Sequence, residues 1–182
     1  MPFAVNLRAS GDAAAYWELV DRAASLEVTP SIRALGYPPH LTLAKYDLVV
    51  PGELESAVDT LAGRAPIPLR FQRIGAFDRG VLILWAAPTP DPALTALHAR
   101  VHALLDPARC TPAYRPGQWV PHCTLALRVA ESQRIAAERL LAAPLTPFVL
   151  SFDVVDCVSS PPINVLAERV LQSASATATP SR

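Results

Sequence analysis

Two kinds of hydrophobic pattern divide the chain: short apolar runs, and longer segments in which apolar residues recur three or four positions apart. Residues 3–8 and 81–87 are short runs of the kind that forms buried strands. A segment of helical periodicity follows each run, the first capped by Ser10 or Asp12, the second beginning with Asp91-Pro92. The predicted buried faces contain Tyr16, Leu19, Val20 and Ala23 in the first helix and Leu94, Leu97, Val101 and Leu105 in the second.

A short motif occurs twice in the chain. Residues 39–44 read PHLTLA and residues 121–126 read PHCTLA, so five of six positions agree at an offset of 82 residues. An aromatic residue stands three positions before each histidine, Tyr37 before His40 and Trp119 before His122. The motifs contain two of the four histidines of the chain. This agreement predicts that the chain consists of two related halves.

The remaining elements follow the same order in both halves. A helix near 51–63 precedes a strand at 67–76, and a helix at 131–143 precedes a strand at 148–158, with a last strand at 163–171. The order β-α-β-α-β, present twice, predicts an α+β fold of two pseudo-symmetric lobes whose antiparallel sheets form a central cleft. We expect one domain over residues 1–172, with lobes at about 1–78 and 79–172. Residues 106–118 are predicted to form a long loop and residues 173–182 a disordered tail.

Composition and charge narrow the class of protein. The chain is 51% hydrophobic, and its 16 basic residues balance its 16 acidic ones. A protein that grips a long nucleic acid usually has a basic excess, so we expect any nucleic-acid partner to be short. No apolar run approaches the ~18 residues of a membrane span, and no signal peptide is visible at the start. Three widely spaced cysteines favour reduced thiols, and hence a cytoplasmic protein.

The two motifs place chemically useful side chains on one face of a strand. Because side chains alternate along a strand, residues two apart share a face. The predicted cleft face therefore carries His40, Thr42, Ala44 and Tyr46 in the first half, and His122, Thr124, Ala126 and Arg128 in the second.

Two histidines on opposite sides of a phosphate can act together as acid and base. An imidazole with its ordinary pKa near 6.5 can be neutral or protonated close to neutral pH. A neutral His40 or His122 can take a proton from the nucleophile while the other, protonated, gives one to the leaving oxygen. The Thr42 and Thr124 hydroxyls can bind the non-bridging oxygens. This chemistry requires no metal and no cofactor.

The paired segments His40-Leu41-Thr42-Leu43 and His122-Cys123-Thr124-Leu125 resemble the HxTL motifs of the 2H phosphoesterase superfamily, which includes the LigT-like 2′-5′ RNA ligases and the cyclic phosphodiesterases. The segment 77–85 is similar to that family's link between lobes, and the resemblance extends over about residues 1–172. It implies a bilobal LigT-like fold and metal-independent chemistry on 2′,3′-cyclic phosphates or 2′-5′ linkages, in RNA processing. It also implies that His122 is the base and His40 the acid, whereas the repeat itself is symmetric.

Further candidates surround the motifs, each with a structural alternative. Tyr37 and Trp119 could stack on a base or pack against the neighbouring prolines. Tyr46 and Arg128, at the far ends of the strands, could contact substrate or the solvent. Tyr114 and Arg115 lie in the long loop, where residues that cover a ligand often occur. His98 and His102 have the i, i+4 spacing of a metal pair, but no carboxylate or cysteine cluster accompanies them, so we expect no metal site.

The expected function is therefore that of a monomeric phosphoesterase that acts on a small nucleotide or an RNA end carrying a cyclic or 2′-5′ phosphate. A non-catalytic module that binds nucleotides or RNA ends in the same cleft is the alternative. A metal-dependent hydrolase is a third interpretation. ATP-dependent ligation is disfavoured because no phosphate-binding loop of the G-x-x-x-x-G-K-[ST] type is present.

Overall fold

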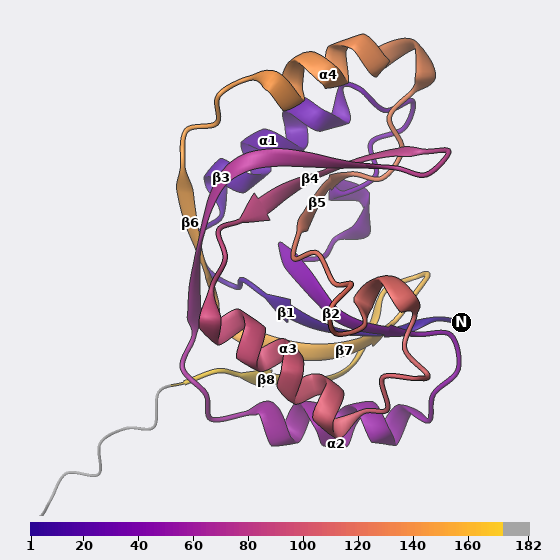
Figure 1. The fold of residues 1–182 in the computed structure, drawn as a ribbon, viewed down its shortest axis with the longest axis vertical. Coiled ribbons are helices and arrows are strands. Elements are labelled where there is room, and N and C mark those ends of the chain that lie inside the picture. Colours follow the sequence, from indigo (N-terminus) through magenta and orange to yellow (C-terminus); the bar gives the residue numbers. More distant parts are fainter. Residues whose placement is uncertain (173–182) are drawn as a thin grey trace, which may run out of the picture.

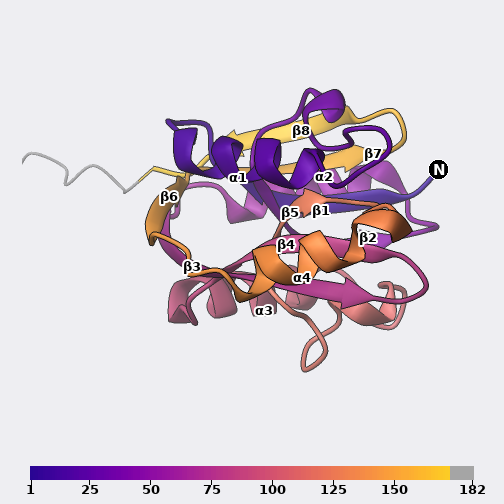
Figure 2. The same ribbon diagram turned by 90° about the horizontal axis from the view of Figure 1, so that it is seen from above.

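A computed structural model describes residues 1–172 as two four-stranded antiparallel sheets with four α-helices (Figure 1). The first sheet has the order β2-β1-β7-β8, and the second has the order β5-β4-β3-β6. The two sheets form separate layers when the molecule is seen from above (Figure 2). The strands of the first sheet are β1 (Phe3–Arg8), β2 (His40–Tyr46), β7 (Val154–Ser159) and β8 (Asn164–Val170). Those of the second are β3 (Ile67–Asp78), β4 (Leu82–Pro88), β5 (Cys123–Ala126) and β6 (Phe148–Phe152). The predicted α+β fold is confirmed, and the predicted tail at 173–182 lies outside the described residues.

The helices bury the predicted apolar faces. Helix α1 (Ala14–Ala24) contacts β5, α2 (Pro51–Leu61) contacts β7 and β8, α3 (Pro92–Leu104) contacts β2, and α4 (Arg134–Ala142) contacts β3. Asp91 caps α3 as predicted, because its carboxylate accepts a hydrogen bond from the Leu94 amide at 2.8 Å. Helix α1 instead begins after Ala13, whose side chain cannot cap, while Asp12 accepts a hydrogen bond from the Ala14 amide.

The predicted strand at 148–158 is wrong in one respect, because it divides at Asp153 into β6 and β7, which lie in different sheets. The Asp153 carboxylate accepts hydrogen bonds from the amide and the hydroxyl of Ser10, at 2.8 and 2.6 Å. Its own amide donates to the Arg8 carbonyl. These bonds tie the crossing point to the end of β1, so the chain leaves the second sheet and enters the first.

The sheets therefore do not coincide with the two halves of the sequence. Strand β3, from the first half, pairs with β4 and β6 in the second sheet, whereas β7 and β8, from the second half, complete the first sheet. The expected lobe boundary at 78/79 falls inside the β3–β4 hairpin. Because each sheet contains strands from both halves, the two layers depend on each other for a complete sheet.

Each motif strand contains a bulge at the same place in the repeat. Val5 pairs with Ala44 and Asn6 with Thr42, so Leu43 is the extra residue in β2. Leu84 pairs with Ala126 and Trp85 with Thr124, so Leu125 is the extra residue in β5. A bulge breaks the strict alternation of side chains beyond it. The residues after Leu43 and Leu125 therefore point to the opposite faces from those that the sequence predicts.

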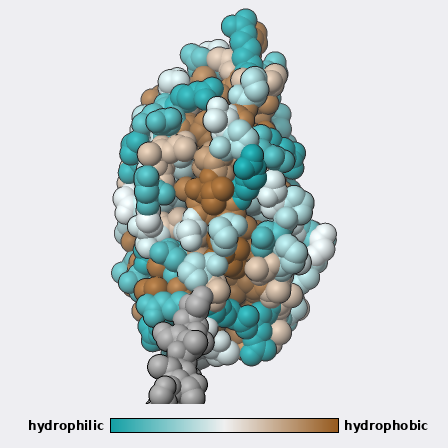
Figure 3. Space-filling view, turned by 90° about the vertical axis from the view of Figure 1, so that its left-hand side faces the viewer, coloured by the Kyte–Doolittle hydropathy of each residue, from teal (hydrophilic) through white to brown (hydrophobic). Residues whose placement is uncertain are grey.

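Hydrophobic residues are not confined to the interior. On the side of the molecule formed by β3 and β6, a strip of hydrophobic side chains lies between hydrophilic ones (Figure 3).

All three cysteines are buried and unpaired. Within residues 1–172, no helix has the length and apolar character needed to cross a membrane.

Candidate active site

The two motifs line one cleft, which consists of two adjoining cavities. One cavity, of about 320 Å³, is lined by His40 and Thr42, and the other, of about 390 Å³, is lined by His122. Four residues line both cavities: Lys45, Tyr114, Thr124 and Leu127. The residues that the repeat singles out are thus brought together around a shared space between β2 and β5.

Both histidines are fixed in the same tautomer by the backbone. The His40 Nδ1 lies 3.0 Å from the Pro38 carbonyl oxygen, and the His122 Nδ1 lies 2.7 Å from the Val120 carbonyl oxygen. Because a carbonyl can only accept, each Nδ1 carries a proton and donates it. In the neutral rings the lone pair is therefore on Nε2, the nitrogen left for a ligand in the cleft.

Aromatic rings support both imidazoles from the side. The ring of Tyr37 meets His40 edge-on, with centroids 4.8 Å apart, and Phe77 meets His122 edge-on at 5.0 Å. Trp85 also lies against His122, with centroids 5.8 Å apart. Gly75 makes room for this tryptophan, since a Cβ atom at that position would overlap the indole ring. Both rings are thus held in place before any ligand binds.

Burial lowers the pKa of both cleft histidines, because a charged imidazole loses solvation there. The hydrogen bonds to Pro38 and Val120 act in the opposite direction. Positive charge on His122 lowers the pKa of His40 further, so the two rings are electrostatically coupled. A pair with only one protonated ring is therefore favoured over a doubly charged pair.

The two threonines differ in their hydrogen bonding. The Thr42 hydroxyl donates to the Asn6 side-chain oxygen at 2.9 Å. Thr124 is held through its backbone, because its carbonyl accepts a hydrogen bond from the Tyr16 hydroxyl at 2.6 Å. The Thr124 side chain borders both cavities of the cleft. Its hydroxyl is available to a ligand, whereas that of Thr42 already has an acceptor.

The bulges bring Lys45 and Leu127 into the cleft in place of Tyr46 and Arg128. Lys45 is half-buried and lines both cavities, while Tyr46 is only 1% exposed and packs in the core. Arg128 is exposed and lines a neighbouring groove of about 740 Å³ instead. The predicted faces of Tyr46 and Arg128 are therefore wrong, because strict alternation does not hold beyond Leu43 and Leu125.

The long loop contributes Tyr114 to the cleft, and two histidines hold it there. Tyr114 lines both cavities. Its carbonyl oxygen accepts hydrogen bonds from Nε2 of His98 at 2.9 Å and Nε2 of His102 at 3.0 Å. The i, i+4 pair thus binds the backbone of the loop. Among residues 1–172, no group of three or more potential metal-ligating side chains comes together.

Arg115 and Trp119 stabilise the same loop. The Arg115 guanidinium donates to the carbonyls of Cys110 and Ala108, at 2.8 and 2.9 Å. The Trp119 indole donates to the Thr42 carbonyl at 2.9 Å and stacks on His98 with centroids 4.0 Å apart. Neither residue lines the two cavities of the cleft. Trp119 instead links the loop before β5 to strand β2 of the opposite sheet.

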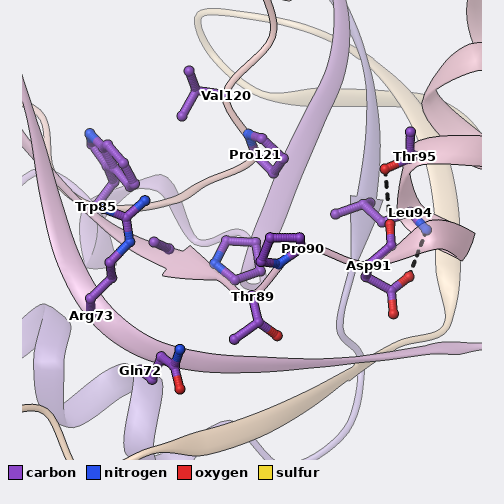
Figure 4. Close-up of a pocket in the computed structure, with 12 residues that line it drawn as sticks. Gln72, Arg73, Trp85, Thr89, Pro90, Asp91, Leu94, Thr95, Val120 and Pro121 are labelled. Carbon is purple, nitrogen blue, oxygen red and sulfur yellow. Dashed lines mark hydrogen bonds between the residues drawn. The ribbon is translucent and has the colours of Figure 1, made fainter.

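A third cavity, of about 280 Å³, lies behind the second motif (Figure 4). Trp85, Val120 and Pro121 line it on one side, and Asp91 on the other. Figure 4 shows the Asp91 carboxylate bonded to the Leu94 amide, so this acid serves as a helix cap. The cavity contains neither cleft histidine.

Sequence reasoning missed several residues that line the cleft. The positions of Lys45 and Leu127 are equivalent in the repeat, and Lys45 is the single lysine of the chain. A lysine that occurs once in the chain, next to the first motif, could have been chosen as a candidate. The bulge that turns Lys45 toward the cleft could not be predicted from the sequence. Asn6, Phe77 and Arg79 are among the other lining residues that were missed.

Burial of the histidines leads to a prediction about stability. All four histidines, His40, His98, His102 and His122, have a pKa below the ordinary value, and desolvation is the largest cause in each case. The unfolded chain then binds more protons than the folded one below about pH 6.5. We expect the free energy of unfolding to fall as the pH drops from 7.5 to 5.5, by at most about 1.4 kcal/mol for each histidine, because only about one pH unit of this range lies below the pKa of the unfolded chain.

Urea unfolding at the two pH values measures this difference. Burial raises the pKa of Asp156, which opposes the trend, so the net change is the quantity to compare. The His98→Gln variant removes one titrating ring and should show a smaller change than the wild type. Equal or greater stability at pH 5.5 would contradict the lowered pKa values of the four rings.

Comparisons with known proteins identify a family and a fold for this chain. The sequence profile of the 2′-5′ RNA ligase superfamily matches residues 13–161. The structure of Escherichia coli LigT with NADP+ is similar with a TM-score of 0.56 and 19% identity, over 94% of this chain and 99% of that one. LigT with 3′-AMP gives 0.55 and 20%, over 95% and 100%. The TT0787 protein of Thermus thermophilus gives 0.55 and 21%, over 95% and 99%. At these identities the solved structures establish the fold. No curated protein matches the chain.

Proposed function

The chain belongs to the 2′-5′ RNA ligase superfamily of 2H phosphoesterases, and on that premise we propose that its cleft opens or forms 2′,3′-cyclic or 2′-5′ phosphodiesters on nucleotides or RNA ends. The observation that carries the proposal is the matched pair of imidazoles. In both, the backbone holds the proton on Nδ1 and leaves Nε2 for a ligand in one shared cleft. A binding module has no need of two coupled titrating rings.

In the proposed hydrolysis, one neutral imidazole takes a proton from water at its Nε2 as the water oxygen bonds to phosphorus. The bond from phosphorus to the 2′ or 3′ oxygen breaks, and the other imidazole, protonated, gives its Nε2 proton to that leaving oxygen. The two rings exchange protonation states, and proton exchange with solvent restores them before the next turnover. The imidazoles thus supply both proton transfers, so we propose that the step needs no metal.

Other cleft residues are suited to the charge of the phosphate. The Thr124 hydroxyl can donate to a non-bridging oxygen, where negative charge develops. Lys45 lines the cleft, and within residues 1–172 no carboxylate lies within ion-pair distance of its ammonium group. Arg79 borders the cavity of His122. These cations are free to neutralise an anionic substrate.

We further propose that the partner is a small nucleotide or a short RNA end, handled by a monomer in the cytoplasm. The related LigT is described in complex with 3′-AMP, ATP and NADP+, which supports ligands of nucleotide size. The net charge of zero does not favour a long nucleic acid.

Product formation from 2′,3′-cyclic AMP in the presence of EDTA tests the proposal, with the His40→Ala protein as control. We expect the wild type to form a nucleoside monophosphate and the variant to form far less. Binding of the cyclic nucleotide without turnover would identify a binding module. Activity that EDTA abolishes and a divalent metal restores would identify a metal-dependent hydrolase.

A further inference from the structure

A buried chain of polar side chains lies behind Thr42. From the Thr42 hydroxyl it runs through Asn6 and Tyr37 to Asp156 and Arg8, all in or beside the first sheet. Asn6 is 2% exposed and Asp156 is 0% exposed. Within residues 1–172, the hydroxyl of Thr124 has no comparable partner. The two halves of the cleft, related by the repeat in sequence, therefore differ in what supports their threonines.

The distances define this chain. The Tyr37 hydroxyl lies 2.6 Å from one carboxylate oxygen of Asp156, and Nε of Arg8 lies 2.9 Å from the same oxygen. The Asn6 amide nitrogen lies 3.3 Å from the other carboxylate oxygen and 3.2 Å from the Tyr37 hydroxyl. The Thr42 hydroxyl lies 2.9 Å from the Asn6 side-chain oxygen.

The carboxylate sets the direction of every hydrogen bond in the chain. Burial raises the pKa of Asp156, whereas the hydrogen bonds from Tyr37 and Asn6 and the ion pair with Arg8 favour its ionised form. In that form the carboxylate can only accept. Tyr37 must therefore donate to it, and Asn6 must turn its NH₂ group toward it. The Asn6 oxygen then faces Thr42, so the hydroxyl of Thr42 must donate to Asn6. Only the lone pairs of the Thr42 oxygen remain for the cleft.

We propose that Asp156 and Asn6 are positioning residues that make Thr42 a hydrogen-bond acceptor in the cleft, so that Thr124 alone of the two threonines donates to the phosphate. This inference rests on the proposed function and assigns unequal tasks to the two motifs. The Thr42 oxygen is suited to accept a hydrogen bond from a hydroxyl group, either the attacking water or a ribose hydroxyl. It is not suited to hold a phosphate oxygen, because two acceptors would face each other.

The two matched variants Thr42→Val and Thr124→Val test the inference, because each removes a hydroxyl and nearly keeps the shape of the side chain. Calorimetric titration with inorganic phosphate measures the donor role. We expect Thr124→Val to weaken phosphate binding about tenfold, as for a lost hydrogen bond to a charged group. Thr42→Val should change it less than twofold but lower kcat for 2′,3′-cyclic AMP. Thr42→Ser, which keeps the hydroxyl, should restore that kcat.

Two other outcomes of the phosphate titration would contradict the inference, and they differ in what they imply for the proposed function. Equal weakening by both valine variants would make Thr42 a donor and overturn the inference, while leaving the proposed function intact. No weakening by either variant would place the phosphate elsewhere and contradict the proposed function as well. Melting temperatures confirm that each protein is folded before it is titrated.

A second variant tests the direction of the hydrogen bonds in this chain of side chains, and it does not depend on Thr42→Val being folded. Asp156→Asn introduces an NH₂ group that can donate to Asn6, so Asn6 can turn and Thr42 can donate to the cleft. We expect phosphate affinity to rise severalfold. Glu168→Gln is the matched control, because Glu168 also pairs with Arg8 and its loss removes the same charge without changing the chain. A rise of equal size in both variants, or no rise in Asp156→Asn, would contradict the inference.

Discussion

Replacing His40 or His122 by alanine should lower kcat for 2′,3′-cyclic AMP by about 10²–10⁴-fold, the usual contribution of one proton-transfer group. The reason is that each Nε2 has a separate task at opposite ends of the same step. The structure supplies no substitute, since the other two histidines are bonded to the Tyr114 carbonyl. Steady-state rates for the wild type and the two variants measure the effect.

A variant that lacks both histidines tests whether His40 and His122 act in the same step. Residues that act as a unit are strongly non-additive, so His40→Ala combined with His122→Ala should be little slower than the worse single variant. Thermal unfolding of all three proteins separates loss of chemistry from loss of structure. Near wild-type turnover by both single variants on every cyclic and 2′-5′ substrate would refute the two-histidine mechanism.

Replacing Lys45 by methionine should lower kcat/KM about 10–100-fold, with most of the change in KM. Methionine keeps much of the aliphatic length of lysine but removes the charge that lies in both cavities of the cleft. A hydrogen bond between charged groups contributes about 1.5–3 kcal/mol, which corresponds to this range. Steady-state kinetics on 2′,3′-cyclic AMP, at fixed ionic strength, separate KM from kcat.

Arg128→Met is the matched control for the lysine variant. Strict alternation along the strands would place Arg128 in the cleft, whereas the bulge at Leu125 turns it outward to the neighbouring groove. We expect Arg128→Met to change kcat/KM less than twofold. The opposite ranking of the two variants would mean that the register of the motif strands differs from the one described above.

The repeat alone predicted four residues that line the cleft. Two HxTL segments at the same offset as their flanking elements predicted that His40, Thr42, His122 and Thr124 would meet, and the cavities bring all four to one cleft. Local signals were also informative. The Asp91-Pro92 pair marks the start of a helix, and apolar spacing identified the buried faces of α1 and α3.

Features that depend on pairing between distant strands could not be predicted. A bulge is a property of two strands, so the sequence of β2 gives no sign that Leu43 is the extra residue and that Lys45 faces the cleft. The break at Asp153 likewise depends on Ser10, far away in the chain. Asn6 and Asp156 are adjacent only because β1 pairs with β7. Their chain to Thr42 was therefore invisible from either segment.

The pH dependence of kcat/KM for 2′,3′-cyclic AMP, measured in EDTA, tests the two-histidine account most directly. The account predicts a bell-shaped profile, because activity requires one neutral and one protonated imidazole. Its maximum should lie below about pH 6.5, since burial lowers both pKa values in the free enzyme. In kcat both limbs should move to higher pH, because bound phosphate favours protonated rings. A profile without two limbs, or activity that disappears in EDTA, would contradict the account.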